Sequence, residues 1–320
     1  MNPYVSLLLT GRNDGYGVDF NDRFLRTLEF NVRELRARQI PFEVVLIEWA
    51  PPEDRPLLAD LVSEQLPGVS DVLTTYVVDA QYQEAMSQNP HLWYLEFVAK
   101  NVGLRRVRGE FVLSTNADVY VSRGILDALA ARTLRPATLY RALRVDVKLG
   151  VDHTHVGWDL LEDERNQLTG QPMRPPLFPG GTGDFLLLDR DTFLKVKGFN
   201  EVYRRARVGV DYNFLVKFYG SGYPIVDIGH PVYHIAHVGG YRPSKSLYRD
   251  HPEKAHYGDH RWPSHAVVYD NHDDWGLVDA PTVPVRPGVF RIPFDWSVVP
   301  PIVDLRRVLL AGARVGRGEL

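Results

Sequence analysis

Short apolar runs alternate with amphipathic segments along the first third of the chain. Four of these runs consist almost entirely of apolar and β-branched residues, which is typical of strands covered on both faces. They occupy residues 5–10, 44–49, 72–78 and 111–113. Between the first two runs, Leu25, Leu28, Val32 and Leu35 recur at the spacing of one helix face. Strands alternating with helices predict a doubly wound, mostly parallel α/β sheet with right-handed crossovers.

A helix followed by a short strand lies at the centre of this pattern. Apolar residues recur at helical spacing over residues 95–102, and the strand at 111–113 follows. Asn116 and Asp118 come next, and extended backbone would place both side chains on one face. Open α/β sheets bind ligands at this edge, where a carboxylate and an amide can hold a divalent cation against a diphosphate. A turn is the alternative explanation, because Asn and Asp also favour loops.

Polar residues also follow the first two strands. The loop from Gly11 to Gly17 contains Arg12 and Asn13, and its backbone amides could face a phosphate. It lacks a P-loop lysine and the GxGxxG spacing, so a plain turn explains it equally well. Glu48 ends the second strand, a place where an acidic residue is usually just solvated.

A second group of polar residues lies beyond the middle of the chain. Three glycines precede Asp184 and an apolar strand at 185–188, which allows either close approach to a ligand or a tight turn. Asp211 opens a helix, where it either takes part in chemistry or stabilises the helix dipole by about 0.3–1 kcal/mol. His234 and His237 are three residues apart, a spacing that occurs in metal sites and also by chance.

Composition narrows the function classes. The formal net charge of −3 over 320 residues argues against both disorder and a nucleic-acid-binding surface. The chain has no cysteine, which excludes disulfides, thiolate metal sites and a thiol nucleophile. No run approaches the ~18 apolar residues of a membrane span, and the chain starts directly with a strand-like segment. We therefore expect a soluble, cytoplasmic protein.

Two stretches together resemble a known family. In nucleotide-sugar glycosyltransferases of the GT-A fold, family 2, a helix with Ala-Lys-Asn-x-Gly leads through Gly-Glu-Phe into a strand ending in Asp-x-Asp. The corresponding residues here are 99–103, 109–111 and 116–118. Residues 179–237 resemble the galactosyltransferase-like members. In these, a glycine-rich loop is followed by Gly-Phe, a carboxylate at a helix start and a metal-binding histidine.

The resemblance implies a GT-A catalytic domain over residues 1–240. Its nucleotide-binding half would end near residue 122, the acceptor half would span 123–240, and residues 241–320 would form a C-terminal extension. It also implies a UDP- or GDP-linked nucleotide sugar as donor, Mn²⁺ or Mg²⁺ as cofactor, and inversion at the transferred sugar. The acceptor hydroxyl would belong to a carbohydrate, a lipid-linked compound or another small molecule.

The resemblance also assigns roles to individual residues. Contacts with the nucleotide are implied for Arg12, Asn13, Glu48, Lys100, Asn101, Asn116 and Asp118. Metal ligands are implied at Asp118, His237 and His234. Asp211 is implied as the general base, with Asp184 as the reserve candidate. Asn116 departs from the family signature, because an amide replaces the first carboxylate, which implies weaker metal binding or an altered metal role.

The remaining segments give less specific expectations. We expect a loop over residues 79–92 and a strand over 139–148, with Arg141, Arg144 and Asp146 at its edges. Residues 150–178 should form a long loop that lines the acceptor pocket or covers the surface. Residues 241–301 show little periodicity. Trp275, in this segment, could either stack against a sugar or pack against the protein. The segment also contains His256, His260 and His265, but their neighbours do not favour a metal site. A basic helix at 304–315 fits homo-oligomerisation or peripheral membrane contact.

Two other functions compete with glycosyl transfer. A sugar-phosphate nucleotidyltransferase would share the sheet and the metal, but it usually carries a basic, glycine-rich loop after the first strand. Arg12 alone is a poor substitute for that loop. A non-catalytic sugar- or nucleotide-binding protein would keep the fold without the full ligand set, and Asn116 and Val210 give that alternative some support.

Overall fold

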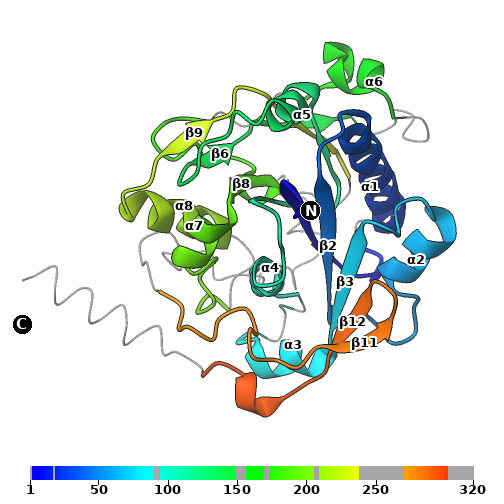
Figure 1. Ribbon diagram of the computed structural model, residues 1–320, viewed down its shortest axis with the longest axis vertical. Coiled ribbons are helices and arrows are strands. Elements are labelled where there is room, and N and C mark those ends of the chain that lie inside the picture. Colours follow the sequence, from blue (N-terminus) through cyan, green and yellow to red (C-terminus); the bar gives the residue numbers. More distant parts are fainter. Residues whose placement is uncertain are drawn as a thin grey trace, which may run out of the picture.

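A mixed sheet organises the described part of the chain, which comprises residues 2–16, 19–89, 92, 94–148, 156–168, 170, 173–204, 209–237 and 270–301. Figure 1 shows this computed structural model. From edge to edge, the nine strands of the sheet within these residues are β11 (Val283–Arg286), β12 (Val289–Ile292), β3 (Leu73–Val78), β2 (Phe42–Trp49), β1 (Val5–Gly11), β4 (Phe111–Thr115), β8 (Phe185–Asp189), β6 (Leu139–Arg141) and β9 (Ile225–Asp227). The five strands from β12 to β4 are parallel neighbours, whereas β8 is antiparallel to β4 and β6. The mostly parallel α/β sheet predicted from the alternation of elements is confirmed.

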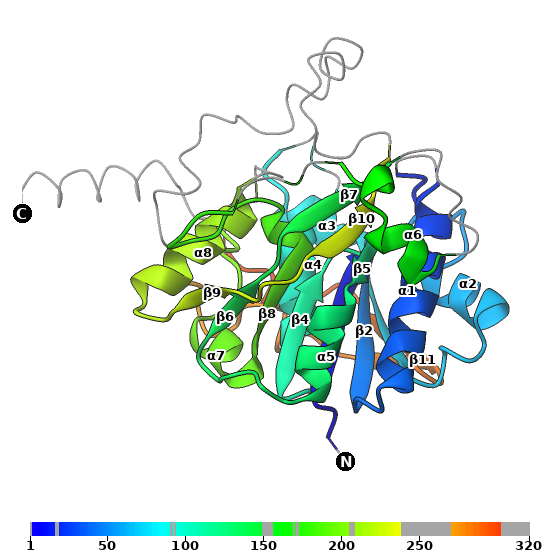
Figure 2. The same ribbon diagram turned by 90° about the horizontal axis from the view of Figure 1, so that it is seen from above.

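Helices cover both faces of this sheet (Figures 1 and 2). Those packed on one face are α1 (Phe20–Ala37), α2 (Leu58–Gln65) and α5 (Arg123–Ala130). Those packed on the other are α3 (Ala80–Met86), α4 (Glu96–Leu104), α7 (Arg190–Lys195) and α8 (Val210–Gly220). Leu8 of β1 joins the second group, and its neighbours Leu7 and Leu9 join the first, because successive strand residues point to opposite faces. The fully buried β1 therefore contributes side chains to the hydrophobic cores on both faces of the sheet.

A second, smaller sheet carries Arg144, Asp146 and His234, which are discussed below. Its strands are β5 (Val119–Val121), β10 (Val232–Ile235) and β7 (Arg144–Val147). β10 lies between the other two, antiparallel to β5 and parallel to β7 (Figure 2). The short helical elements are α6 (Trp158–Glu162), η1 (Glu164–Asn166), η2 (Thr182–Asp184) and η4 (Trp296–Val298).

Three local expectations differ from the structure. Residues 79–92, expected as a loop, contain α3, whose few apolar residues Tyr82 and Met86 are fully buried. The single strand expected over 139–148 is divided into β6 and β7, which belong to different sheets. Residues 116–118 form a turn between β4 and β5 rather than extended backbone. In each case a short segment is shaped by contacts with parts of the chain that are distant in sequence.

The described C-terminal residues 270–301 are an integral part of the fold. β12 pairs with β3 in parallel and so extends the main sheet by a hairpin that the weak periodicity did not predict. Trp275 is 2% exposed, and the guanidinium of Arg105, the residue that follows α4, lies 4.0 Å from its ring centroid. Packing, the second of the two roles considered for Trp275, is what the structure provides.

Several expectations concern residues outside those described. The boundary expected at residue 240, the histidines at 256, 260 and 265, and the basic helix at 304–315 all fall there. Most of the described part of the 150–178 segment is irregular, apart from α6 and η1. Within the described residues, no helix is both long enough and apolar enough to cross a bilayer.

Candidate functional site

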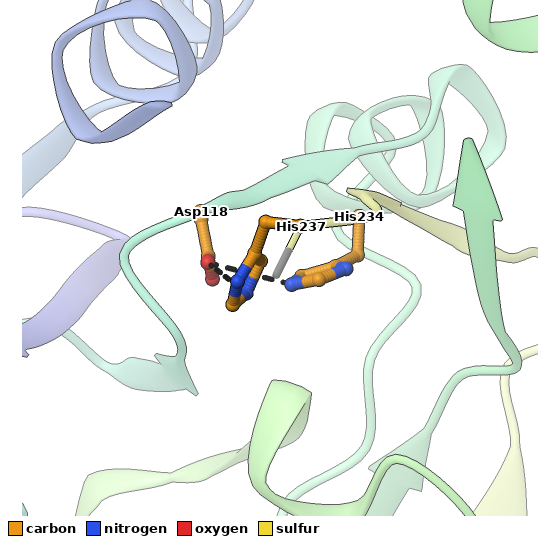
Figure 3. A group of neighbouring side chains, drawn as sticks. All are labelled: Asp118, His234 and His237. Atoms are coloured by element: carbon orange, nitrogen blue, oxygen red, sulfur yellow. Dashed lines mark ion pairs between the residues drawn. The ribbon is translucent and has the colours of Figure 1, made fainter. Parts of the chain in front are cut away.

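Asp118, His234 and His237 converge beyond the carboxyl end of β4 (Figure 3). The Nε2 atom of each histidine lies 3.4 Å from Oδ2 of Asp118. One potential ligand atom from each of the three side chains lies within 4.8 Å of the other two. Among the described residues, no other group of three or more His, Cys, Asp or Glu side chains meets this condition. The three residues predicted as metal ligands are therefore brought together.

Strand pairing in the small sheet explains this convergence. His234 in β10 is in register with Val119 of β5, the residue that follows Asp118. On its other side, His234 is in register with Asp146 of β7. The backbone ladder thus fixes His234 between two carboxylates from distant parts of the sequence. His237 follows three residues later and packs edge-on against Tyr16, with ring centroids 5.6 Å apart.

The electrostatics of this cluster favour an ionised Asp118. Burial alone would raise the pKa of Asp118, but the charge of His234 and hydrogen bonds from His234 and His237 hold it well below its usual value. Burial alone would lower the pKa of His234, but the neighbouring Asp118 carboxylate raises it to about 9. Arg23 of α1 adds a further positive charge, with Nε 3.4 Å from Oδ2 of Asp118.

Asn116 has other partners than Asp118, because the chain turns between them. Its Nδ2 donates to Oδ1 of Asp184 at 2.7 Å, and its Oδ1 accepts from Nζ of Lys100 at 3.0 Å. The amide thus links an ammonium group and a carboxylate, and each end of it has the correct polarity for its partner. The hydrogen bonds around position 116 explain why an amide, rather than the expected carboxylate, occupies it.

Lys100 is fully buried, and its ammonium group has three acceptors. Besides Asn116, these are Oε1 of Glu96 at 2.9 Å and the carbonyl oxygen of Gly183 at 3.0 Å. The lysine therefore joins α4, the turn after β4 and the glycine-rich loop before β8. Its burial excludes a solvated helix face, and a nucleotide contact by Lys100 stays a prediction.

Asp211 lies close to the same group of residues. A Cβ atom added at Gly183 would lie 3.6 Å from Oδ2 of Asp211 and 3.9 Å from Nζ of Lys100, which places both groups around this glycine. Asp211 is partly exposed and stands in the first turn of α8. Burial among protein atoms raises the pKa of Asp211, opposed by a hydrogen bond from the backbone N–H of Tyr212.

Asp184 has a different environment. It is 2% exposed, and its carboxylate accepts from Asn116 and, at 2.9 Å, from NH1 of Arg144. Both of its oxygens are thus engaged by the protein, whereas Asp211 has an accessible surface. Of the two carboxylates predicted as general base, Asp211 has the more suitable surroundings.

The first-loop residues connect the ends of β1 and β2. Nε of Arg12 pairs with Asp14 at 2.9 Å, and its NH1 donates to the carbonyl oxygen of Ala50 at 3.0 Å. Nδ2 of Asn13 donates to the carbonyl oxygen of Pro56 at 3.0 Å. These bonds shape the loop, and the nucleotide contacts of Arg12 and Asn13 stay predictions.

Glu48 and Asn101 make hydrogen bonds inside the fold. The buried carboxylate of Glu48 accepts from the backbone N–H groups of Leu58 and Ala59, both at 2.9 Å, and so caps the start of α2. Burial raises the pKa of Glu48 to about 7. Asn101 is fully buried and bonds to the backbone of Phe199 and to Glu201. These contacts account for both residue types, and a nucleotide contact by either stays a prediction.

Sequence reasoning did not assign a role to three basic residues around the site. Arg23 has no motif that distinguishes it within the amphipathic α1. Arg141 and Arg144 were expected only at the edges of a strand. Arg141 is fully buried and donates to four carbonyl oxygens in the glycine-rich loop and beside it, those of Phe178, Gly180, Thr182 and Phe185. Such a buried arginine gives no signal in a single sequence, because its carbonyl partners can belong to any residue type.

We expect Asn116→Asp to destabilise the protein without tightening Mn²⁺ binding. A carboxylate at position 116 would face Oδ1 of Asp184 and lose the hydrogen bond, at a cost of about 1–3 kcal/mol. Denaturant unfolding and Mn²⁺ titration would measure the two effects. The double variant Asn116→Asp/Asp184→Asn exchanges amide and carboxylate and should recover part of the stability. Tighter Mn²⁺ binding by Asn116→Asp would contradict this interpretation, since it would mean that position 116 reaches the cation.

Comparison with known proteins identifies the fold of this chain. The sequence matches no family model and no curated protein. The structure of GalNAc-T7 with UDP, GalNAc and Mn²⁺ matches 79% of this chain with a TM-score of 0.50 and 13% identity. The match covers 48% of that chain, so this protein spans about half its length. The catalytic domain of Drosophila β1,4-galactosyltransferase 7 in complex with xylobiose matches with a TM-score of 0.39 and 12% identity, over 95% of this chain and 96% of that one.

The protein has the GT-A glycosyltransferase fold. The fold expected from the sequence motifs is thereby confirmed.

Proposed function

We propose that this protein is a metal-dependent glycosyltransferase. It would transfer a sugar from a nucleoside-diphosphate sugar to an acceptor hydroxyl, with inversion at the anomeric carbon. The observation that carries this proposal is the convergence of Asp118, His234 and His237 at the end of β4 in a GT-A fold. The similar structure of GalNAc-T7 contains UDP, GalNAc and Mn²⁺, which supports a UDP-linked donor over a GDP-linked one.

The donor set of the cluster fits a divalent transition-metal ion. Two imidazole nitrogens and one carboxylate are close enough to share a cation. Mg²⁺ prefers oxygen ligands almost exclusively, whereas imidazole suits transition metals. The imidazoles favour a transition metal over Mg²⁺, and the Mn²⁺ in the GalNAc-T7 structure supports Mn²⁺ among the transition metals, with Asp118, His234 and His237 as its protein ligands. Bound there, the cation would offset the negative charge that develops on the diphosphate leaving group.

A second carboxylate would complete the reaction. Asp211 would accept the proton of the acceptor hydroxyl as its oxygen attacks the anomeric carbon. A carboxylate that acts as base must be ionised, and the positive charge of Lys100 opposes the effect of burial on Asp211. A single displacement of this kind inverts the configuration of the transferred sugar. The glycine-rich loop, held by Arg141, would leave room for the sugar between these groups.

Mn²⁺ should tighten the binding of UDP by roughly 5–150-fold, the usual range of coupling between two ligands. Isothermal titration of UDP and GDP, with Mn²⁺ and with a chelator, would measure it. Asp118→Asn should lose most of the metal effect. Asp191→Asn, which alters an almost fully exposed carboxylate on α7, should behave like the unchanged protein. Equal affinity with and without metal for both nucleotides would refute the metal-dependent site.

The products of turnover separate glycosyl transfer from the two competing functions. Incubation with labelled nucleotide sugars and candidate acceptors should release the nucleoside diphosphate and label the acceptor, only when Mn²⁺ is present. A nucleotidyltransferase would instead exchange pyrophosphate into a nucleoside triphosphate. Binding without any turnover across donors and acceptors would favour a binding protein.

A further inference from the structure

The buried ring of His234 has two neighbours at the nitrogen that faces away from Asp118. Nδ1 lies 2.8 Å from Oδ1 of Asp146 and also 2.8 Å from NH2 of Arg144. Nε2 faces Asp118 (Figure 3). His234 is 2% exposed, so these groups rather than solvent determine where the hydrogen of its ring resides.

The two neighbours of Nδ1 have opposite effects. Asp118 favours the protonated ring in the metal-free protein, but a histidine that ligates a cation must be neutral. A neutral imidazole carries one hydrogen, on one of its two nitrogens. If Nδ1 carries it, Asp146 accepts this hydrogen and Nε2 keeps a lone pair toward Asp118. If Nε2 carries it, Nδ1 accepts from Arg144 and Nε2 cannot ligate a cation. The balance between Asp146 and Arg144 therefore decides whether His234 is able to bind metal.

The contacts of Arg144 favour Asp146 in this competition. Its Nε and NH2 donate to Oδ1 of Asp146 at 3.0 and 2.7 Å, and its NH1 donates to Asp184. The guanidinium is thus occupied by two carboxylates, which are stronger acceptors than a neutral ring nitrogen. It also holds Oδ1 of Asp146 beside Nδ1 of His234. The register of β7 with β10 places Asp146 directly opposite His234, so the carboxylate does not depend on a mobile loop.

We propose that Asp146 is a positioning residue of the metal site: it accepts the Nδ1 hydrogen of His234 and thereby directs the Nε2 lone pair to the cation. The inference rests on the proposed metal-dependent function. Asp146 acts through His234, supported by Arg144, and is not itself counted among the ligands. Carboxylates that bind the second nitrogen of a ligating histidine fix its orientation and strengthen it as a ligand.

Asp146→Asn should weaken Mn²⁺ binding by about 10–100-fold, the range found for such supporting groups. The measurement is a titration of the full chain with Mn²⁺ alone, in which electron paramagnetic resonance detects the free ion. Asp184→Asn is the matched control, because it removes the other carboxylate bound to Arg144 without a contact to His234, and its effect should be much smaller. In a His234→Gln background, Asp146→Asn should cost little more.

The outcomes separate this inference from the proposed function. If the unchanged protein does not bind Mn²⁺, the metal-dependent function fails. If it binds Mn²⁺ and Asp146→Asn binds it equally well, the role of Asp146 is overturned and the metal site stands. A second test needs no variant and so does not depend on how a variant folds. It uses nitrogen-15 spectra of the unchanged protein, labelled at histidine, with Zn²⁺ as a diamagnetic probe. A hydrogen on Nδ1 of His234 supports the inference, and a hydrogen on Nε2 overturns it.

Discussion

Asp211→Asn should lower the rate of sugar transfer by about 10²–10⁴-fold, the usual contribution of general-base catalysis. The amide is nearly isosteric with the carboxylate, so folding and donor affinity should change little. Because burial raises the pKa of Asp211, the rate of the unchanged protein should fall as the pH drops through that raised value. The variant should lack this acid limb. Single-turnover transfer of labelled sugar across a pH series would measure both effects.

Asp184→Asn is the companion to this experiment. Its carboxylate is held by Arg144 and Asn116, so its replacement should lower stability more than it lowers the chemical step. If Asp211→Asn turns over normally and Asp184→Asn does not, Asp184 is the base. If both variants transfer sugar at the normal rate, the inverting mechanism itself is wrong.

Trp275→Ala should lower the free energy of unfolding by about 3–5 kcal/mol, as is typical of large aromatic residues removed from a core. Its ring is buried against Gly198, where an added Cβ would lie 2.7 Å from Cζ3. Its backbone oxygen accepts from Nε of Arg105 at 3.0 Å. Denaturant unfolding, followed by circular dichroism, would measure the loss.

Trp296→Ala provides the matched control for this prediction. Trp296 lies on the same C-terminal segment but is 71% exposed, so its removal should change stability by only about 0.5 kcal/mol. Equal, small losses in both variants would mean that residues 270–301 contribute little to the stability of the fold. A large loss confined to Trp275→Ala would show that the segment completes the core around α4.

The apolar runs of the sequence predicted the central strands well, because near-continuous burial leaves a strong local pattern. The segments that were predicted wrongly are those whose structure depends on distant partners. α3 has too few apolar residues to show a helical period. β12 forms a strand because it pairs with the edge of β3. Local sequence carries little information about such pairings.

The same distinction applies to the site. That Asp118, His234 and His237 lie close together could be predicted because they match the spacing of the family that the sequence resembles. The partners of Asn116 could not, since Lys100 and Asp184 reach it from a helix and a loop far away in the chain. The period-two argument for Asn116 and Asp118 failed because it assumes extended backbone, and the chain turns there.

The hairpin of β11 and β12 also affects how the protein behaves toward other chains. Without it, β3 would present a bare sheet edge with the uncharged sequence Leu-Thr-Thr-Tyr-Val-Val, a template for intermolecular pairing. The edge that replaces it is poorly suited to such pairing. β11 contains Pro284, which has no N–H to donate, carries the charged Arg286, and has an irregular register between these two residues. By placing this strand at the rim, the C-terminal segment should lower the tendency of the sheet edge to pair with other chains, although Val283 and Val285 of β11 are exposed.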